Sequence, residues 1–386
     1  MSGPVVADLG EAGILERIAP LLPSGRDVLV GPGDDCAVLA APDGRYCVST
    51  DVLVEGRHFR TDWSSGFDVG ARAAAQNLAD VAAMGARPVA LVACLVLPGA
   101  TPVDWVVDLA RGMALRCREA GTAVVGGDLS AGEGLVVAVT VHGDLEGRAP
   151  VLRSGAHPGQ ALVLAGTPGR AAAGLALLEA GWGRRDDDEA GLAGAAAVPE
   201  TAAVAETDAA LALAEDCAAV FRAPRPPLKA GPALAGIGAS AMMDVSDSLV
   251  RDCGRIALAS GVVIDIDDPD DDCAALAADR AELEGVAALV PGARSAAVGT
   301  GAARGTGAAR GTGGIRPDPR ETARNWVLTG GEDHGMLATV PADAARSLPE
   351  GARVIGRVRR AGEAGPGVLV GTRPWSGARG WDHFRA

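Results

Sequence analysis

Lysine is almost absent from this chain of 386 residues, where Lys229 is the only one. A P-loop nucleotide site needs the pattern GxxxxGK[ST], and no Ser or Thr follows Lys229, so that class is excluded. The 49 acidic residues outnumber the 35 basic ones, and the net charge of −14 disfavours a nucleic-acid partner. Chemistry on phosphate would therefore have to use arginine, backbone N–H groups or metal ions.

Paired cysteines and long apolar runs are missing as well. The seven cysteines never form a C-x-x-C pair, which is typical of reduced, buried thiols rather than of a disulfide framework or a zinc site. The N-terminus lacks the apolar segment of a signal peptide, and the uncharged stretch 88–103 is too short and too rich in proline to cross a bilayer. We therefore expect a cytoplasmic protein with no membrane association.

Aromatic residues are few, yet 48% of the residues are apolar, so Ala, Val and Leu must build the core. The length fits two domains, and strand and helix signals alternate in both halves, which predicts an α/β (α+β) fold. We place the boundary in the Gly- and Pro-rich segment 143–158. Periodicity predicts helices over 9–22, 68–86 and 103–120, with Asp68 as the N-cap of the second, and strands over 28–30, 46–48, 89–97, 122–125, 135–141 and 161–165.

Two segments resemble surface decorations. The acidic run 183–189 and the segment 299–314, in which GTGAAR occurs twice, cannot bury much apolar surface. We expect a flexible insertion around 295–320. A further acidic run, 265–272, is interpreted as a solvated loop rather than a metal site.

Acidic residues recur at strand ends, in turns and on one helix face. On the helix 68–86, Arg72, Gln76 and Asp80 share a polar face because they are spaced four residues apart. Turns are commonly rich in Asp and Gly for structural reasons, so any single site is weak evidence. Taken together, the sites favour magnesium-dependent chemistry on a polyphosphate, since carboxylates are ligands of hard cations. The sites are Asp34-Asp35, Asp51, Asp80, Asp128, Asp244 with Asp247, and Glu332-Asp333.

The wording and order of these motifs resemble the thiamine-monophosphate kinase family, of the superfamily that includes aminoimidazole ribonucleotide synthetase. The resemblance covers nearly the whole chain apart from the repeat insertion. It is carried by Gly31-Pro-Gly-Asp-Asp-Cys-Ala-Val38, Ser49-Thr-Asp-Val-Leu-Val-Glu-Gly-Arg-His-Phe59, Gln76-Asn-Leu-Ala-Asp-Val-Ala-Ala-Met-Gly-Ala86, Gly126-Gly-Asp128, Arg153-Ser-Gly155, Met243-Asp-Val-Ser-Asp247, Gly330-Gly-Glu-Asp333 and Gly380-Trp-Asp-His-Phe384.

The resemblance implies ATP-dependent phosphorylation of thiamine monophosphate to thiamine diphosphate, the last step of thiamine diphosphate biosynthesis. It implies a two-domain synthetase-kinase fold, in which an N-terminal domain (1–148) binds ATP and Mg²⁺ and forms a homodimer through its mixed sheet. A C-terminal α/β domain (149–386) completes the chain.

The resemblance also implies a role for individual residues. Several magnesium ions would be shared by Asp35, Ser49, Thr50, Asp51, Asp80, Asp128, Asp244 and Asp247, of which Asp51, Asp128 and Asp247 form the catalytic set. ATP would contact Gly127, Asp128, Arg153 and Ser246, and the thiamine phosphate would contact His58, Glu332 and Trp381. Read without the resemblance, His58 is equally a half-buried core residue, Trp381 a packing anchor and Arg153 a salt-bridge residue.

The acceptor phosphate is ionised near neutral pH because its second pKa is about 6, so no strong general base is needed. We therefore expect direct in-line transfer aided by magnesium. The chain departs from the family pattern at Leu129, Ser130, Ser248, His334 and Gly335. The alternatives are another ATP-dependent superfamily member, such as aminoimidazole ribonucleotide synthetase, and a non-catalytic nucleotide-binding homologue.

Overall fold

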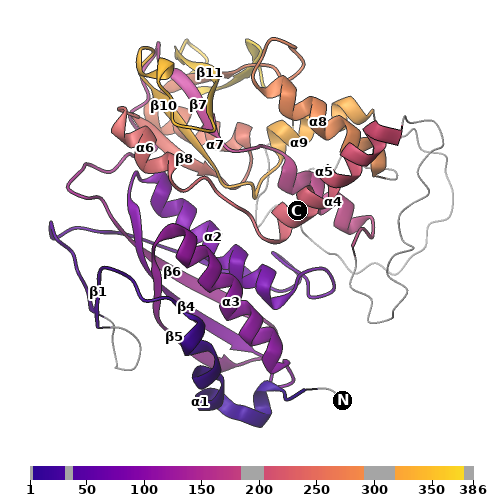
Figure 1. The fold of residues 1–386 in the computed structure, drawn as a ribbon. Coiled ribbons are helices and arrows are strands. Elements are labelled where there is room, and N and C mark those ends of the chain that lie inside the picture. Colours follow the sequence, from indigo (N-terminus) through magenta and orange to yellow (C-terminus); the bar gives the residue numbers. More distant parts are fainter. Residues whose placement is uncertain (1–2, 31–37, 184–203, 291–317, 378–386) are drawn as a thin grey trace. The chain divides into compact units, whose positions relative to one another are not determined.

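The computed structural model describes residues 3–30, 38–183, 204–290 and 318–377 (Figure 1). Its contacts divide the chain into two compact units. Unit 1 comprises 1–152 and 222–237, and unit 2 comprises 153–221 and 238–386. We keep the two-domain division as a proposal, with the return segment 222–237 added to the first domain.

Unit 1 is built on a four-stranded sheet in the order β3 (Cys47–Val54), β6 (Val136–Asp144), β4 (Arg87–Leu97), β5 (Ala123–Ala131). β4 and β5 run parallel and the other pairs antiparallel. The long helices α2 (Gly66–Ala83) and α3 (Val103–Ala120) lie side by side over one face of this sheet (Figure 1). The remaining elements of unit 1 are α1 (Val6–Ile18), a 3-10 turn (Ala19–Leu21), the ribbon β1 (Val28–Val30) with β2 (Val38–Leu39), and α6 (Ala230–Gly236).

Glycines let α2 and α3 approach backbone to backbone. A Cβ atom on Gly70 would lie 1.9 Å from the carbonyl oxygen of Leu109, and one on Gly112 would lie 2.0 Å from that of Phe67. Beneath the helices, the alternate residues Val137, Val139 and Val141 of β6 are buried with the apolar side chains of α2 and α3. The helix pair is therefore fixed closely over the sheet, which matters because α2 carries polar site residues.

The other face of the same sheet carries both apolar and polar side chains and is largely uncovered within the described residues. Along β3, Val48 is 60% exposed and Val52 45% exposed, while the alternate residue Leu53 is buried. Only its margin is covered, where β1 and β2 pack on a small cluster around Val89 and Val125. This uncovered face is a candidate contact surface.

Unit 2 contains a seven-stranded mixed sheet among its described residues. The order is β13 (Arg373–Pro374), β12 (Gly367–Val370), β9 (Val262–Ile266), β11 (Ala352–Arg360), β7 (Ala161–Ala165), β10 (Gly335–Val340), β8 (Ala241–Val245). Strands β12 and β9 are parallel and the other pairs are antiparallel. Its helical elements are α4 (Arg170–Glu179), α5 (Val204–Arg222), α7 (Leu249–Ser260), α8 (Leu276–Leu289), α9 (Pro319–Thr329) and a 3-10 turn (Ala344–Arg346).

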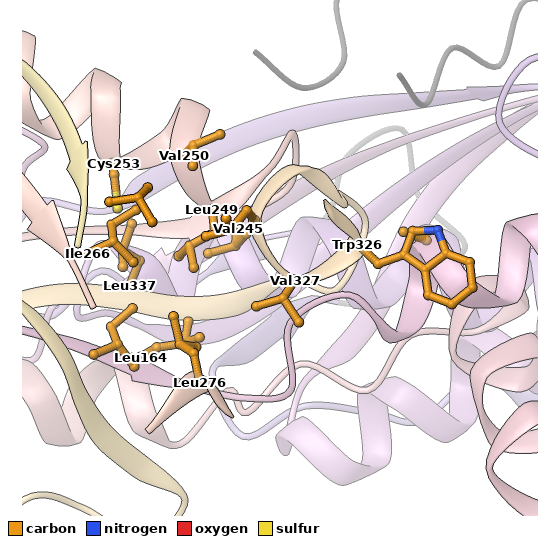
Figure 2. Close-up of a cluster of buried hydrophobic side chains, with 14 of the residues drawn as sticks. Leu164, Val245, Leu249, Val250, Cys253, Ile266, Leu276, Trp326, Val327 and Leu337 are labelled. Carbon is orange, nitrogen blue, oxygen red and sulfur yellow. The ribbon is translucent and has the colours of Figure 1, made fainter. Parts of the chain in front are cut away.

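The core of unit 2 joins its strands to its helices. Figure 2 shows Leu164 of β7 and Leu337 of β10 close to Ile266 of β9 and Leu276 of α8, with Trp326 and Val327 coming from α9. All of these side chains are at least 90% buried. Burial of large aliphatic groups of this kind stabilises a domain by about 1.5–3 kcal/mol per side chain.

The mixed α/β class predicted from the sequence is confirmed, with helix 103–120 at its predicted bounds. Some details of the prediction were wrong. The first helix ends at Ile18 and continues only as a 3-10 turn. The N-cap of α2 is Ser65, not Asp68: the Asp68 N–H donates to Ser65 Oγ (3.2 Å) while Asp68 Oδ2 accepts from the Ser65 N–H (2.8 Å), a reciprocal capping box.

Both predicted insertions fall mainly outside the described residues, namely 184–189 of the acidic run and 291–317 around the GTGAAR repeat. Among the residues that the structure does describe, no helix is long and apolar enough to cross a membrane.

Candidate active site

In unit 1, β3 and α2 bring predicted metal ligands together. Ser49 Oγ donates a hydrogen bond to Asp80 Oδ2 (2.7 Å), and Gln76 Nε2 donates one to Asp51 Oδ2 (3.1 Å). Ser49 and Asp51 are two residues apart on a strand, so their side chains share the face toward α2. The result is a group of oxygen donors at the junction between strand and helix.

Asn77 belongs to this group, although the sequence analysis did not single it out. It is 1% exposed, its Oδ1 accepts from the Asp51 backbone N–H (3.2 Å), and its Nδ2 donates to the Ala73 carbonyl (2.9 Å). Buried amides are normally hydrogen-bonded in this way. Its position between Gln76 and Asp80 in the Gln-Asn-Leu-Ala-Asp motif was the available signal.

Thr50 and Asp128 face the opposite side of the sheet from Asp51. Thr50 Oγ1 lies 3.1 Å from Thr140 Oγ1 on that side, and Asp128 accepts from Ser130 Oγ (2.8 Å), while Leu129 between them packs under the helices. Strands β6 and β4 separate β3 from β5, which places Asp51 and Asp128 roughly 14 Å apart at about 4.8 Å per strand. One cation cannot bridge these two carboxylates within a single chain.

Gly127 and Asp128 line an apolar cavity of about 810 Å³ in unit 1. The cavity walls come mainly from aliphatic residues of α1, α3, β4 and β5. Gly127 cannot carry a side chain, because a Cβ would lie 1.9 Å from the Ala93 carbonyl oxygen. The volume is in the range of small-molecule sites.

His58 lies just after β3 and is half-buried. Its Nδ1 accepts a hydrogen bond from the Val54 backbone N–H (3.0 Å), so the ring is the neutral tautomer with its proton on Nε2. The backbone thus orients the ring with Nε2–H as a donor.

In unit 2, the turn after β8 and the turn before β10 are bound together. The Glu332 N–H donates to the Ser246 carbonyl (2.8 Å) and the His334 N–H to the Val245 carbonyl (2.9 Å). A Cβ on Gly331 would lie 2.4 Å from the Ser246 carbonyl oxygen, so only glycine allows this approach. The two predicted motifs around Asp247 and Glu332 are therefore one local structure.

His334 stands between two acids in this structure. Its Nδ1 lies 3.0 Å from Asp244 Oδ2 and its Nε2 lies 3.4 Å from Glu332 Oε2. Burial alone would lower the pKa of His334, but the hydrogen bond to Asp244 and the nearby carboxylate of Glu332 outweigh it and raise that pKa to about 10. The two carboxylates thus favour the protonated form of the ring.

Asp333 points away from these residues and caps a helix. Its carboxylate accepts from the backbone N–H groups of Gly169 and Ala171 (both 2.7 Å) at the start of α4. Burial raises the pKa of Asp333 to about 7, against the two N–H donors that favour its charged form. This acid of the Gly-Gly-Glu-Asp motif has a structural role.

Asp247 pairs with Arg255, which lies in the second turn of α7. The same guanidinium donates to Asp252 Oδ1 (2.6 Å). Asp252 is fully buried, and its Oδ2 accepts from the Asp247 and Ser248 N–H groups. Burial raises the pKa of Asp252 to about 7, while Arg255 acts in the opposite direction. Neither residue was predicted, although the sequence places an acid and an arginine soon after the Asp-Val-Ser-Asp motif.

The other predicted residues are less informative. Ser246 is half-buried, and Arg153 is exposed, with its backbone carbonyl accepting from Ser260 Oγ (3.2 Å). Asp35 and Trp381 lie outside the described residues. Across the described ranges, no three His, Cys, Asp or Glu side chains are gathered as a ready metal site.

The mixed sheet of unit 1 and its carboxylates correspond to a known class. Residues 33–145 match the model of the AIR synthase related protein, N-terminal domain. More particularly, the chain belongs to the thiamine-monophosphate kinase family, since it is 40% identical over 382 residues to the thiamine-monophosphate kinase of Mycobacterium tuberculosis (strain ATCC 25618 / H37Rv). That alignment covers 99% of this chain and 93% of the relative. The resemblance predicted from the motifs is thereby confirmed.

Solved structures agree with this assignment. The thiamine-monophosphate kinase from Stenotrophomonas maltophilia K279a superposes with a TM-score of 0.68 at 28% identity, covering 94% of this chain and 97% of that one. The structure of AaThiL complexed with AMPPCP and TMP gives a TM-score of 0.63 at 24% identity and covers 98% of each chain. The second likeness bears on the fold alone.

Proposed function

We propose that this chain transfers the terminal phosphoryl group of ATP to thiamine monophosphate and forms thiamine diphosphate. The observation that carries the proposal is the similarity to thiamine-monophosphate kinases over nearly the whole chain, which includes the Ser49, Asp51 and Asp80 group. The AaThiL structure holds AMPPCP, an ATP analogue, together with TMP. ATP as the phosphate donor and thiamine monophosphate as the acceptor follow from this assignment.

Magnesium fits the oxygen donors of unit 1. The ion prefers octahedral oxygen coordination and is commonly held by one or two carboxylates, with water and substrate phosphates completing the shell. Asp51 and Asp80 supply the carboxylates and Ser49 the hydroxyl, so a gathered cluster of three acids is not required. Bound magnesium would supply the positive charge that offsets repulsion between the donor and acceptor phosphates.

The separation of Asp51 from Asp128 favours more than one cation position. Each carboxylate is on its own face of the sheet, so each would hold its own ion or phosphate contact. In unit 2, Asp244 and Asp247 are the proposed ligands. The ions would take the place of the lysines that the sequence lacks.

The remaining residues of the proposed site bind and orient the substrates. The imidazole of His58, which the Val54 N–H orients through Nδ1, is the proposed contact of the anionic acceptor. Arg153 is a long, exposed cation suited to ATP phosphates, and Gly127 lets the backbone approach the nucleotide. Glu332 and Trp381 are the other proposed contacts of the thiamine moiety.

The transfer is proposed to be direct and in line. The acceptor is already an anion near neutral pH, so the chain needs to align the phosphates rather than remove a proton. A single displacement inverts the configuration at a chirally labelled phosphorus. Retention of configuration would require a phosphoenzyme and would contradict this step.

A homodimer through the uncovered face of the unit 1 sheet is also proposed. Val48 and Val52 are exposed apolar residues on β3, and Tyr46 immediately before that strand is 59% exposed. Neighbouring exposed apolar side chains mark interaction surfaces on many soluble proteins. A second copy of the chain is the proposed partner.

A substrate panel tests the proposed activity against its alternatives. Purified protein is incubated with Mg²⁺ and ATP plus either thiamine monophosphate or the aminoimidazole ribonucleotide precursor, and ADP release is measured. We expect release with thiamine monophosphate only. Release only with the aminoimidazole precursor would favour the synthetase, and ATP binding without any release would favour a non-catalytic homologue.

A further inference from the structure

His334 lies between Asp244 and Glu332 and contacts both carboxylates. Asp244 and His334 are at most 5% exposed, and the imidazole lies between the two carboxylates at 3.0 and 3.4 Å. Asp244 is the last but one residue of strand β8, whereas Glu332 lies in the turn that precedes β10. One side chain therefore links two elements that are distant in sequence.

The backbone conformation of residues 332–334 places the His334 ring between the two acids. Glu332 and His334 have φ angles of 68° and 52°, in the left-handed region that side-chain-bearing residues seldom adopt. The conformation is held by the hydrogen bonds of both residues to the turn after β8 and by Gly331, which packs against Ser246. Left-handed backbone at two alternate residues puts Glu332 and His334 together, while Asp333 between them caps α4.

A packing role alone does not require histidine. A phenylalanine has similar size but no ring nitrogen, so it would leave the buried Asp244 carboxylate without its partner at 3.0 Å. It would also leave Glu332 without the neighbouring ring nitrogen. The polar atoms of the ring, rather than its volume, determine how the two acids are oriented.

We propose that His334 is a positioning residue that fixes the carboxylates of Asp244 and Glu332 relative to each other. The proposal rests on the proposed function, in which Asp244 is a magnesium ligand and Glu332 faces the thiamine phosphate. His334 touches neither substrate in this account. It thereby links the position of the magnesium ligand Asp244 to the position of Glu332, which contacts the acceptor.

Three variants test this role. His334→Phe keeps an aromatic ring of similar size but removes both ring nitrogens, and His334→Gln keeps a polar group that can form hydrogen bonds. His157→Phe, at an exposed histidine of unit 2, is the control. Magnesium binding in the presence of AMPPCP is measured by calorimetry, without turnover, and the KM for thiamine monophosphate and kcat are measured separately. Loss of partners that orient metal ligands commonly costs 10- to 100-fold in affinity or activity.

For His334→Phe we expect at least a tenfold weaker magnesium affinity and at least a tenfold higher KM for thiamine monophosphate, with an unfolding temperature close to that of the original chain. His334→Gln should recover part of the magnesium affinity, and His157→Phe should match the original chain. Original values for His334→Phe would overturn the proposal. Equal losses in both His334 variants with equal falls in unfolding temperature would also overturn it, since they would indicate packing alone.

If His334→Phe does not fold, the measurements on His334→Gln test the positioning role instead. Weaker magnesium binding at an unchanged unfolding temperature supports the positioning role, and original binding with an original KM overturns it. Failure of the proposed function looks different, because the unsubstituted chain would then bind magnesium and AMPPCP but form no thiamine diphosphate.

Discussion

Asp51 is the central residue of the unit 1 site, because neighbouring residues hold it in place by hydrogen bonds. Its carboxylate accepts from Gln76 and its backbone N–H donates to Asn77, so both strand and helix fix its position. An amide in place of the carboxylate would keep the size of the side chain but lose the negative charge that a cation requires. The residue therefore separates a metal-binding role from a structural one.

Asp51→Asn is expected to reduce turnover at least a thousandfold while leaving the unfolding temperature within a few degrees of the original. The same result is expected for Asp128→Asn on the other face of the sheet. Asp108→Asn, an exposed helix residue paired with Arg111, is the control and should keep the original rate. Near-normal rates in both site variants would refute the metal assignment.

Asp333 belongs to a motif that predicted a functional site, but its contacts indicate that it stabilises the fold. Asp333→Ala would leave two buried backbone N–H groups of α4 without acceptors. We expect the free energy of unfolding in urea to fall by about 2 kcal/mol, in the range found for lost helix caps and unsatisfied buried donors. Asp343→Ala, at an exposed position, should change it by less than about 0.5 kcal/mol. Equal effects would contradict the capping role.

At the scale of elements, the close crossing of α2 over α3 places Gln76, Asn77 and Asp80 over β3. The crossing depends on glycine, because the carbonyl of Leu109 occupies the place of a Gly70 side chain. A shift of α2 by even one carbon diameter would move three polar site residues away from Ser49 and Asp51. Helix packing and site geometry are thus linked.

Gly70→Ala is therefore expected to lower the free energy of unfolding by about 3 kcal/mol, at the upper end of overpacking effects. Gly134→Ala is the matched control, since a Cβ there meets no heavy atom within 4 Å. Chemical unfolding followed by circular dichroism measures both. Equal stability of the two variants would show that α2 and α3 can separate without cost.

The elements also show which features sequence patterns predict. The helix 103–120 was predicted at its bounds because its apolar spacing and Gly121, with a φ of 66°, mark it locally. Strand β3 was predicted only over 46–48, yet it runs to Val54. Its polar residues form hydrogen bonds with α2 and β6, so they are part of the strand although they interrupt its apolar pattern. A pattern of apolar residues cannot anticipate partners that are distant in sequence.

The acidic run 265–272 illustrates the same limit. It was interpreted as a solvated loop, and residues 267–272 do form a loop that is exposed at 270–272. Asp265 differs, because it is 1% exposed in β9 and accepts from Arg357, Arg359 and the Thr372 N–H. Asp268 and Asp270 pair with Arg324. The arginines come from α9 and β11, so only the folded sheet brings them to these acids.

At the scale of the whole molecule, the acidic excess and the missing lysines fit a phosphate-handling protein that relies on cations from solution. The family motifs predicted this function, and the roles that they imply for single residues stay predictions. The partition of Asp51 and Asp128 between two faces of one sheet was not predictable, because it depends on strand order and on the β-bulge near Val92. The uncovered face of that sheet leads to a prediction about assembly.

Cys94 lies on this face, beside Asp128 in the pairing of β4 with β5, and is exposed in the single chain. If two copies cover the face, iodoacetamide should modify Cys94 at least tenfold more slowly than the exposed Cys273 at pH 8. Buried Cys117 is an internal standard, because burial raises the pKa of its thiol to about 12 and keeps it protonated until the pH approaches that value. Equal rates at Cys94 and Cys273, read by mass spectrometry, would contradict a dimer through this face.

The central claim is the formation of thiamine diphosphate, and phosphorus NMR of a single reaction tests it most directly. Purified chain is mixed with thiamine monophosphate, ATP and Mg²⁺, and the resonances of both thiamine phosphates and of ADP are followed over time. The account predicts one thiamine diphosphate for each ADP and no reaction after chelation of Mg²⁺. Release of inorganic phosphate with ADP, without any thiamine diphosphate, would contradict it.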